Sequence, residues 1–219
     1  MVKKIERLTV FCVLAGVFFC GGCGIVGLVG TPSQYEKKIS AEYDLTKQKG
    51  KKILVLVEQP GGFSTKANLR YYLTEAIRDS LISQVKVRPK YILSYKDVSE
   101  FRSNRSDFSS LSPEEVGKAL GADIVLLVMI KDCRLNDVAG SGYYNGTLSA
   151  QAAVYEVDGG KVWEGRSVEV GFDTGERGQE ETIGRLVDAC AFCITRNLYN
   201  CPKYKFRISD EGKNTGWGD

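Results

Sequence analysis

The side chains of this sequence that could do chemistry are cysteines in its C-terminal half. Cys190 and Cys193 are separated by two residues, the spacing of redox pairs and of many zinc ligands. A redox pair normally begins a helix, because the helix N-terminus lowers the thiol pKa. This pair instead lies inside a helical pattern, with Cys190 on its apolar face. The spacing alone therefore does not establish thiol chemistry.

Three interpretations of these cysteines stay open. They can be buried structural residues. Cys190 or Cys193 can form a disulfide with Cys201, because an oxidising compartment favours such bonds. The third interpretation is a zinc site that also uses Cys133. We predict no metal and no other cofactor.

Other chemistry lacks the residues that it needs. The chain has no histidine, which removes the commonest general base and metal ligand. The stretch Pro60–Lys66 has glycines and a lysine without the spacing of a phosphate-binding loop. A small-ligand cleft at Gly61 and Gly62 is a further option. We predict no enzyme activity and identify no small-molecule substrate.

The N-terminus predicts export. Lys3, Lys4 and Arg7 precede the uncharged stretch Leu8–Phe19, and small residues follow it. A basic start, an apolar core of about 7–15 residues and small residues at the exit describe an export signal. An uncleaved inner-membrane anchor is the alternative, because residues 8–30 carry no charge and about 20 apolar residues span a bilayer.

The end of this stretch resembles the lipobox of bacterial lipoproteins, in which a cysteine is acylated with fatty acids such as palmitate. Gly21 and Gly22 precede Cys23, although Cys20 stands where a lipobox usually has an aliphatic residue. The resemblance implies a signal peptide over residues 1–22 and a lipid on Cys23. Gly24, rather than an aspartate, follows this cysteine. By resemblance to lipoprotein sorting, this implies the outer membrane as the destination, with the domain facing the periplasm.

Composition divides the rest of the chain. Residues 31–50 are polar, so we predict a lipid anchor and flexible tether over 23–50. A globular mixed domain follows over 51–208, and a loose tail over 209–219. Without the signal peptide the net charge falls from +3 to +1. A nearly neutral domain gives no electrostatic reason to expect nucleic acid as a partner.

Apolar periodicity predicts the elements that position the cysteines. Two aliphatic runs predict buried strands, and apolar residues at every fourth position of 69–85 predict an amphipathic helix. Ser112, Pro113 and Glu115 form the start of a second helix. Alternating residues on both sides of Asp158–Gly159 predict a hairpin. The predicted strands are 53–57, 91–93, 124–130, 147–157, 162–170 and 206–208, and the last helix covers 183–198.

This order predicts an α/β (α+β) fold, a single mixed sheet of four to five strands flanked by helices. The segment Glu115–Val125 and the hairpin Val154–Trp163 resemble pieces of the curli-secretion lipoprotein CsgG, the lipoprotein activators of penicillin-binding proteins and the N-terminal domain of TolB. The resemblance implies the topology of that group and no catalytic residue. Tyr35–Lys38 and Tyr43–Leu45 also resemble small planctomycete lipoproteins of uncharacterised function.

The leading hypothesis is a membrane-tethered periplasmic lipoprotein that acts as a non-enzymatic interaction or scaffold module, with an envelope protein as its partner. The alternative is a thiol-dependent envelope lipoprotein that uses the cysteine pair for redox or metal binding. Exposed aromatic candidates for a partner surface are Tyr143, Tyr144 and Trp217.

Overall fold

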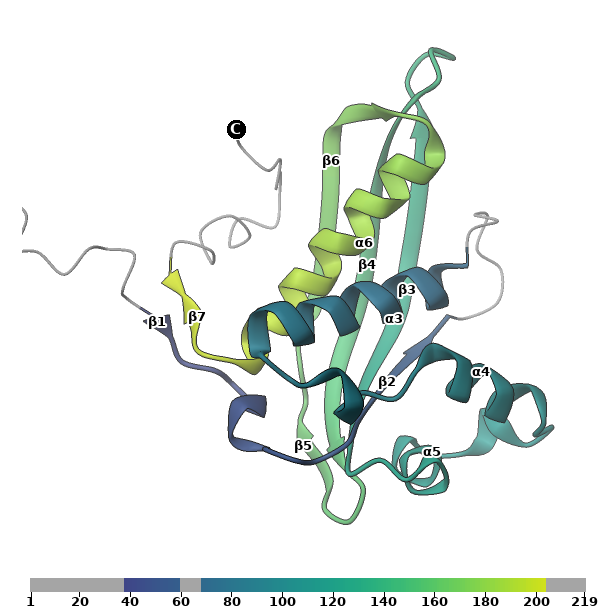
Figure 1. Ribbon diagram of the computed structural model, residues 1–219. Helices are drawn as coiled ribbons and strands as arrows, with labels where there is room; N and C mark the ends of the chain where they lie inside the picture. The colour runs from purple at the N-terminus through teal and green to yellow at the C-terminus, as the bar shows by residue number, and fades with distance from the viewer. Residues whose placement is uncertain (1–37, 60–67, 204–219) are drawn as a thin grey trace, which may run out of the picture. The chain divides into compact units, whose positions relative to one another are not determined.

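The computed structural model describes residues 38–59 and 68–203, which belong to one compact unit. The predicted mixed sheet flanked by helices is confirmed (Figure 1). The strands are β1 (Lys38–Ile39), β2 (Ile53–Glu58), β3 (Ile124–Asp137), β4 (Tyr143–Glu156), β5 (Gly160–Trp163), β6 (Ser167–Arg177) and β7 (Cys201–Pro202). The α-helices are α3 (Leu69–Ser80), α4 (Tyr95–Ser103), α5 (Pro113–Leu120) and α6 (Gln179–Thr195).

Five strands form the main sheet in the order β2-β3-β4-β5, and β6 also pairs with β4. β2 and β3 are parallel, and every other pair is antiparallel. β2 pairs only with the first part of β3, Ile124–Met129, so the β3–β4 hairpin continues past the end of β2. β1 and β7 form a separate two-stranded sheet.

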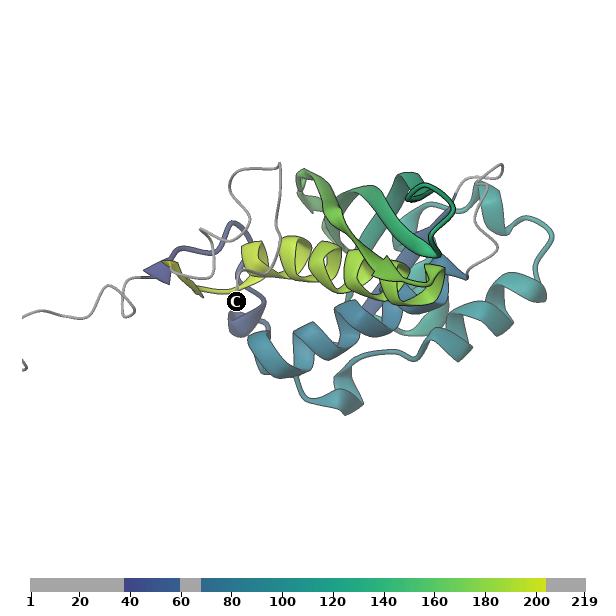
Figure 2. The ribbon, with the colours of Figure 1, turned by 90° about the horizontal axis from the view of Figure 1, so that it is seen from above.

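Helices cover the sheet on both faces, and this explains why β2 is an uninterrupted aliphatic run from Ile53 to Val57. α3 and α6 pack on one face, where they enclose the larger core, and Figure 2 shows them on the same side of the sheet. α4 and α5 cover Leu54, Leu56 and Val125 on the other face. A strand buried on both faces is aliphatic throughout, as β2 is.

α3 has an unusual last turn. Its apolar residues are four apart and all buried: Leu69, Leu73, Ile77, Leu81 and Val85. An α-helix has 3.6 residues per turn, so a four-residue spacing drifts around a regular helix. A wider π-helical turn over Leu81–Val85 follows α3 and offsets this drift. Lys86 then ends the helix with a φ of 67°.

The second arm of the predicted hairpin is two strands rather than one. β5 and β6 pair with successive parts of β4, and Gly165 lies between them. Gly165 has a φ of 68°, and a Cβ there would stand 1.6 Å from the carbonyl oxygen of Ala152. Only glycine fits this close approach. The alternating pattern of residues 162–170 did not reveal the break.

Residues 38–50, here the N-terminal arm, are folded onto the domain, although they were predicted as part of the tether over 23–50. Leu45 is buried in the larger core. Glu42 accepts a hydrogen bond from Trp163 Nε1 at 2.9 Å, and Tyr43 donates to Glu156 at 2.9 Å. These few anchoring side chains hold a segment whose overall composition is polar. The folded domain therefore includes residues 38–50, which were predicted as part of the tether.

Several predictions fall outside the described residues, namely the signal peptide 1–22, the strand 206–208 and the tail 209–219. Residues 91–93 form a single bridge from Ile92 to Ile53 instead of a strand. None of the helices within 38–59 and 68–203 combines the length and the apolar character needed to cross a bilayer.

Candidate functional site

The structure places the four described cysteines in the core. Cys190 and Cys193 lie on α6, Cys201 on β7 and Cys133 on β3, and all four are buried. The structure has no disulfide among them, so the bond to Cys201, one of the three open interpretations, is not formed there. The chain leaves α6 through a short 3-10 turn, and pairing of Cys201 with Ile39 fixes its position without a covalent link.

Burial also makes these thiols poor nucleophiles. It raises the pKa of Cys133 to about 11, and the charge of Asp132 adds to the effect. Burial raises the pKa of Cys190 further, with Cys193 and Cys133 as smaller causes. The thiolate is the reactive form, so little of it exists at neutral pH. Among the described residues, no group of three or more cysteines and carboxylates is arranged to hold a metal ion.

Two exposed tyrosines and a half-buried one, Tyr95, form an aromatic cluster, called the tyrosine cluster below. Tyr71 and Tyr72 in the first turn of α3 are 44% and 45% exposed. Tyr71 meets Tyr72 and Tyr95 edge to face, with ring centroids 5.6 and 5.3 Å apart. Asn68 links the two helix starts, because it caps α3 and donates to the Tyr95 hydroxyl at 3.3 Å. Neighbouring tyrosines at 71 and 72 were the available sequence signal.

The predicted aromatic candidates are elsewhere. Tyr143 is exposed at the start of β4, and Tyr144 beside it is half-buried. Tyr144 is held by the hydroxyl of Thr182, which donates to its carbonyl oxygen at 3.1 Å. Trp217, Gly61, Gly62 and the lipid attachment residue Cys23 lie outside the described residues.

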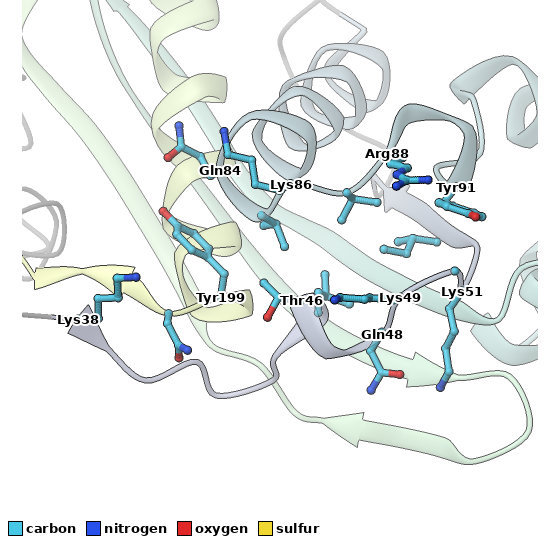
Figure 3. A pocket seen from close by; sticks show the side chains of 16 residues that line it. Lys38, Thr46, Gln48, Lys49, Lys51, Gln84, Lys86, Arg88, Tyr91 and Tyr199 are labelled. Atoms are coloured by element: carbon cyan, nitrogen blue, oxygen red, sulfur yellow. The ribbon is translucent and has the colours of Figure 1, made fainter. Parts of the chain in front are cut away.

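A second surface feature is a cavity of about 810 Å³, called the basic groove below. It lies between the N-terminal arm, the end of α3 with the segment after it, and the chain beyond α6 (Figure 3). Lys38 and Tyr199 lie at one end, Lys49 in the middle, and Arg88 with Lys51 at the other end. Apolar side chains also line it. The cationic lining residues are Lys38, Lys49, Lys51, Lys86 and Arg88, and the apolar ones Leu45, Ile53, Val85 and Val87.

The charges of the basic groove are largely unpaired. No carboxylate is found among the described residues that line it. Lys51 has one partner, Glu156, at 3.5 Å. Among the described residues, Lys38, Lys49, Lys86 and Arg88 form no ion pair. The signal for this groove was present in the sequence as two basic alternations, Lys47–Lys51 and Lys86–Lys90.

A smaller cavity of about 510 Å³, the arginine hollow, lies between the end of β2 and helices α4 and α5. Its guanidinium groups have partners inside the fold. Arg102 pairs with Glu58 and stacks on Phe108 with 4.6 Å from the guanidinium carbon to the ring centroid. Arg105 pairs with Asp107 at 2.6 Å. The Arg102 pair links α4 to the end of β2, whereas the Arg105 pair is local to the segment after α4.

The sequence matches no protein-family model and no curated protein. Solved structures share the fold. Lipoprotein GNA1162 from Neisseria meningitidis is 22% identical, with a TM-score of 0.40 over 64% of this chain and 94% of its own. A PelC dodecamer from Paraburkholderia phytofirmans is 13% identical, with a TM-score of 0.43 over 74% and 94%.

The C-terminal domain of LpoB from Salmonella enterica is 19% identical, with a TM-score of 0.32 over 61% of this chain and 84% of its own. These likenesses concern the fold alone. Of these three proteins, GNA1162 is named a lipoprotein. The narrower CsgG and TolB grouping and the planctomycete resemblance stay predictions.

Proposed function

We propose that this protein is a membrane-tethered lipoprotein of the bacterial envelope whose domain is a non-enzymatic interaction module facing the periplasm. Cys23 carries the lipid, and residues up to 37 connect it to the domain. The outer membrane is the proposed location, with the Gly24 resemblance as its basis. The domain binds an envelope protein rather than transforming a substrate.

The observation that carries the interaction role is the tyrosine cluster. Tyrosine is enriched at protein interfaces, because it offers a large contact area with a hydroxyl at its end. Tyr71 and Tyr72 keep nearly half of their surface exposed while their backbone is fixed in α3. Their mutual edge-to-face contacts hold the rings before any partner arrives, so little side-chain entropy is lost on binding.

The enclosed thiols support the same assignment. The thiol-dependent alternative needs cysteines that can reach a partner thiol or a metal ion. Cys190 and Cys201 are 0% exposed, and the raised pKa of Cys190 keeps it protonated. No observation on the described residues favours the redox or metal role.

The lipid and the interaction are tested separately. Intact mass of the native protein reports cleavage before Cys23, the fatty acids and any disulfide in one measurement. A full-length chain without acyl groups, recovered from the soluble fraction, contradicts the tether.

For the interaction, full-length chains carrying Tyr71→Ala and Tyr72→Ala are compared with Tyr143→Ala, an equally exposed tyrosine on β4. Mild crosslinking in intact envelopes is followed by purification, and the crosslinked fraction is measured. Truncation of interface hot spots weakens binding by about tenfold or more, so the double variant loses the adduct and Tyr143→Ala keeps it. Recovery of the wild-type protein alone contradicts the proposal.

A further inference from the structure

We infer that the basic groove binds phosphate groups of anionic phospholipids in the membrane to which the chain is tethered. This inference rests on the proposed function for its location. The groove itself is argued from charge, shape and position.

The charge of the groove calls for an anionic occupant. Of the lining side chains in the described part of the chain, five are cationic and none is anionic. The nearby carboxylates are already engaged, Glu156 by Lys51 and Tyr43, and Asp44 by Lys47 and Thr46. The C-terminus of α3 contributes only about half a negative charge. Like charges held together without a counter-charge repel each other, and a bound anion removes that repulsion.

The shape suits a headgroup that joins phosphate to an apolar part. Ammonium and guanidinium groups donate to phosphate oxygens in charge-assisted hydrogen bonds. Cationic side chains lie along the length of the groove, from Lys38 at one end to Arg88 at the other (Figure 3). Between them, Leu45, Ile53 and Val87 give apolar contact surface for the glycerol and the upper part of a lipid chain.

The position brings the groove to the bilayer. Lys38, which lines the groove, is also the residue at which the described chain begins. Residues 23–37 form the proposed connection to the lipid. A flexible chain of that length has an r.m.s. reach of roughly 20 Å, so it lets the groove approach the bilayer surface to within a Debye length of about 8 Å, where the charges attract each other. Near an anionic surface each basic side chain strengthens binding about fivefold.

The test uses the full-length protein in phosphatidylcholine nanodiscs with or without about one third phosphatidylglycerol, a fraction high enough to give a strongly negative surface. An amine reagent labels exposed lysines, and mass spectrometry reports the rate at each site. We expect labelling of Lys38, Lys49 and Lys86 to slow several-fold in the anionic discs and to recover in high salt. Lys118 and Lys131, exposed lysines of α5 and β3, label equally in both.

A charge-matched pair of variants sharpens the result. Lys49→Gln, Lys86→Gln and Arg88→Gln together remove three groove charges and leave Lys38 as the reporter. Lys118→Gln, Lys131→Gln and Lys161→Gln remove three charges elsewhere. Three losses of about fivefold each predict binding about a hundredfold weaker for the groove variant. Protection of Lys38 is therefore lost in the first variant and kept in the second.

Each remaining outcome decides something. Equal labelling of wild-type Lys38, Lys49 and Lys86 in both discs overturns the inference, whatever the variants do. Equal protection by inorganic phosphate in neutral discs overturns the lipid source and assigns a free phosphate site. Co-migration of the chain with neutral discs tests the lipid anchor separately. A missing anchor and a groove that binds no phospholipid therefore give different results.

Discussion

The two cavities lie at opposite ends of β2 and use their positive charges differently. Ile53, which begins β2, lines the basic groove, and Glu58, which ends it, lines the arginine hollow. In the hollow, Arg102 is paired with Glu58 and stacked on Phe108. In the groove, four of five cations have no carboxylate partner among the described residues. Charges that are paired within the fold stabilise it, whereas unpaired charges are available to a ligand.

This contrast is unexpected for the topology. Ligands of open α/β sheets usually bind outside the carboxyl ends of the parallel strands. Here that end of β2 carries the hollow whose arginines are engaged, and the groove lies at the amino end. The N-terminal arm creates the difference, because it supplies Lys38 and Lys49 to the groove.

The largest expected effect is a loss of folding free energy when the N-terminal arm is released from the domain, which also takes the groove apart. Leu45→Ala removes a side chain that is 3% exposed and anchors the 3-10 turn to the core. Large-to-small substitutions of this kind cost about 2–3 kcal/mol. Urea unfolding followed by circular dichroism measures it. Lys49→Ala, an exposed change in the same arm, is the control and stays within about 0.5 kcal/mol of wild type. Equal stability of both variants would mean that the arm does not hold the domain.

An intermediate effect compares the same substitution in the two cavities. Arg102→Gln breaks the pair with Glu58 and the stacking on Phe108, which together contribute about 1–2 kcal/mol for a partly buried site. Arg88→Gln removes a charge with no ion pair and leaves the free energy of unfolding within about 0.5 kcal/mol of wild type. Urea midpoints of the two variants decide the matter. If Arg88→Gln is the more destabilising change, the contrast between the cavities is wrong.

The smallest effect is a pH dependence of the N-terminal arm, which comes from Asp44 beside the groove. The Thr46 hydroxyl donates to the Asp44 carboxylate and holds its pKa below the usual value, with the Thr46 backbone N–H and Lys47 adding to this and burial opposing it. A folded pKa below the unfolded one stabilises the protein above the unfolded pKa of about 3.9. This stability is lost as the pH falls through the folded pKa.

The check is thermal unfolding of wild type and Asp44→Asn from pH 7 to pH 3. The wild type has the higher Tm at pH 7, and the gap narrows below pH 4 as the carboxylate is protonated. A difference in Tm that stays constant over this range would mean that the charge of Asp44 does not stabilise the arm.

Much of the fold could be predicted from sequence because its signals are local. The capping box of Ser112 and Glu115 and the turn at Gly121 mark α5 where the structure has it. α4 was missed because it buries only Val98, although Ser94 and Asp97 form a second capping box before it. The residues of the basic groove come from segments far apart in the chain. Their assembly depends on how the arm packs against the domain. Leu45 and Tyr43 anchor this packing within an otherwise polar stretch.

The wide turn at the end of α3 has a consequence for related chains. A π-helical turn corresponds to one residue inserted into an ordinary helix. Deleting one residue from Leu81–Val85 gives a regular α-helical turn, and the next segment of the chain keeps nearly the same direction, because the π-helical turn has already absorbed the extra residue. Lys86 and Arg88 then still face the arm. A homologous chain that lacks this one residue therefore still shares the cationic groove, provided that it keeps basic residues at these two positions.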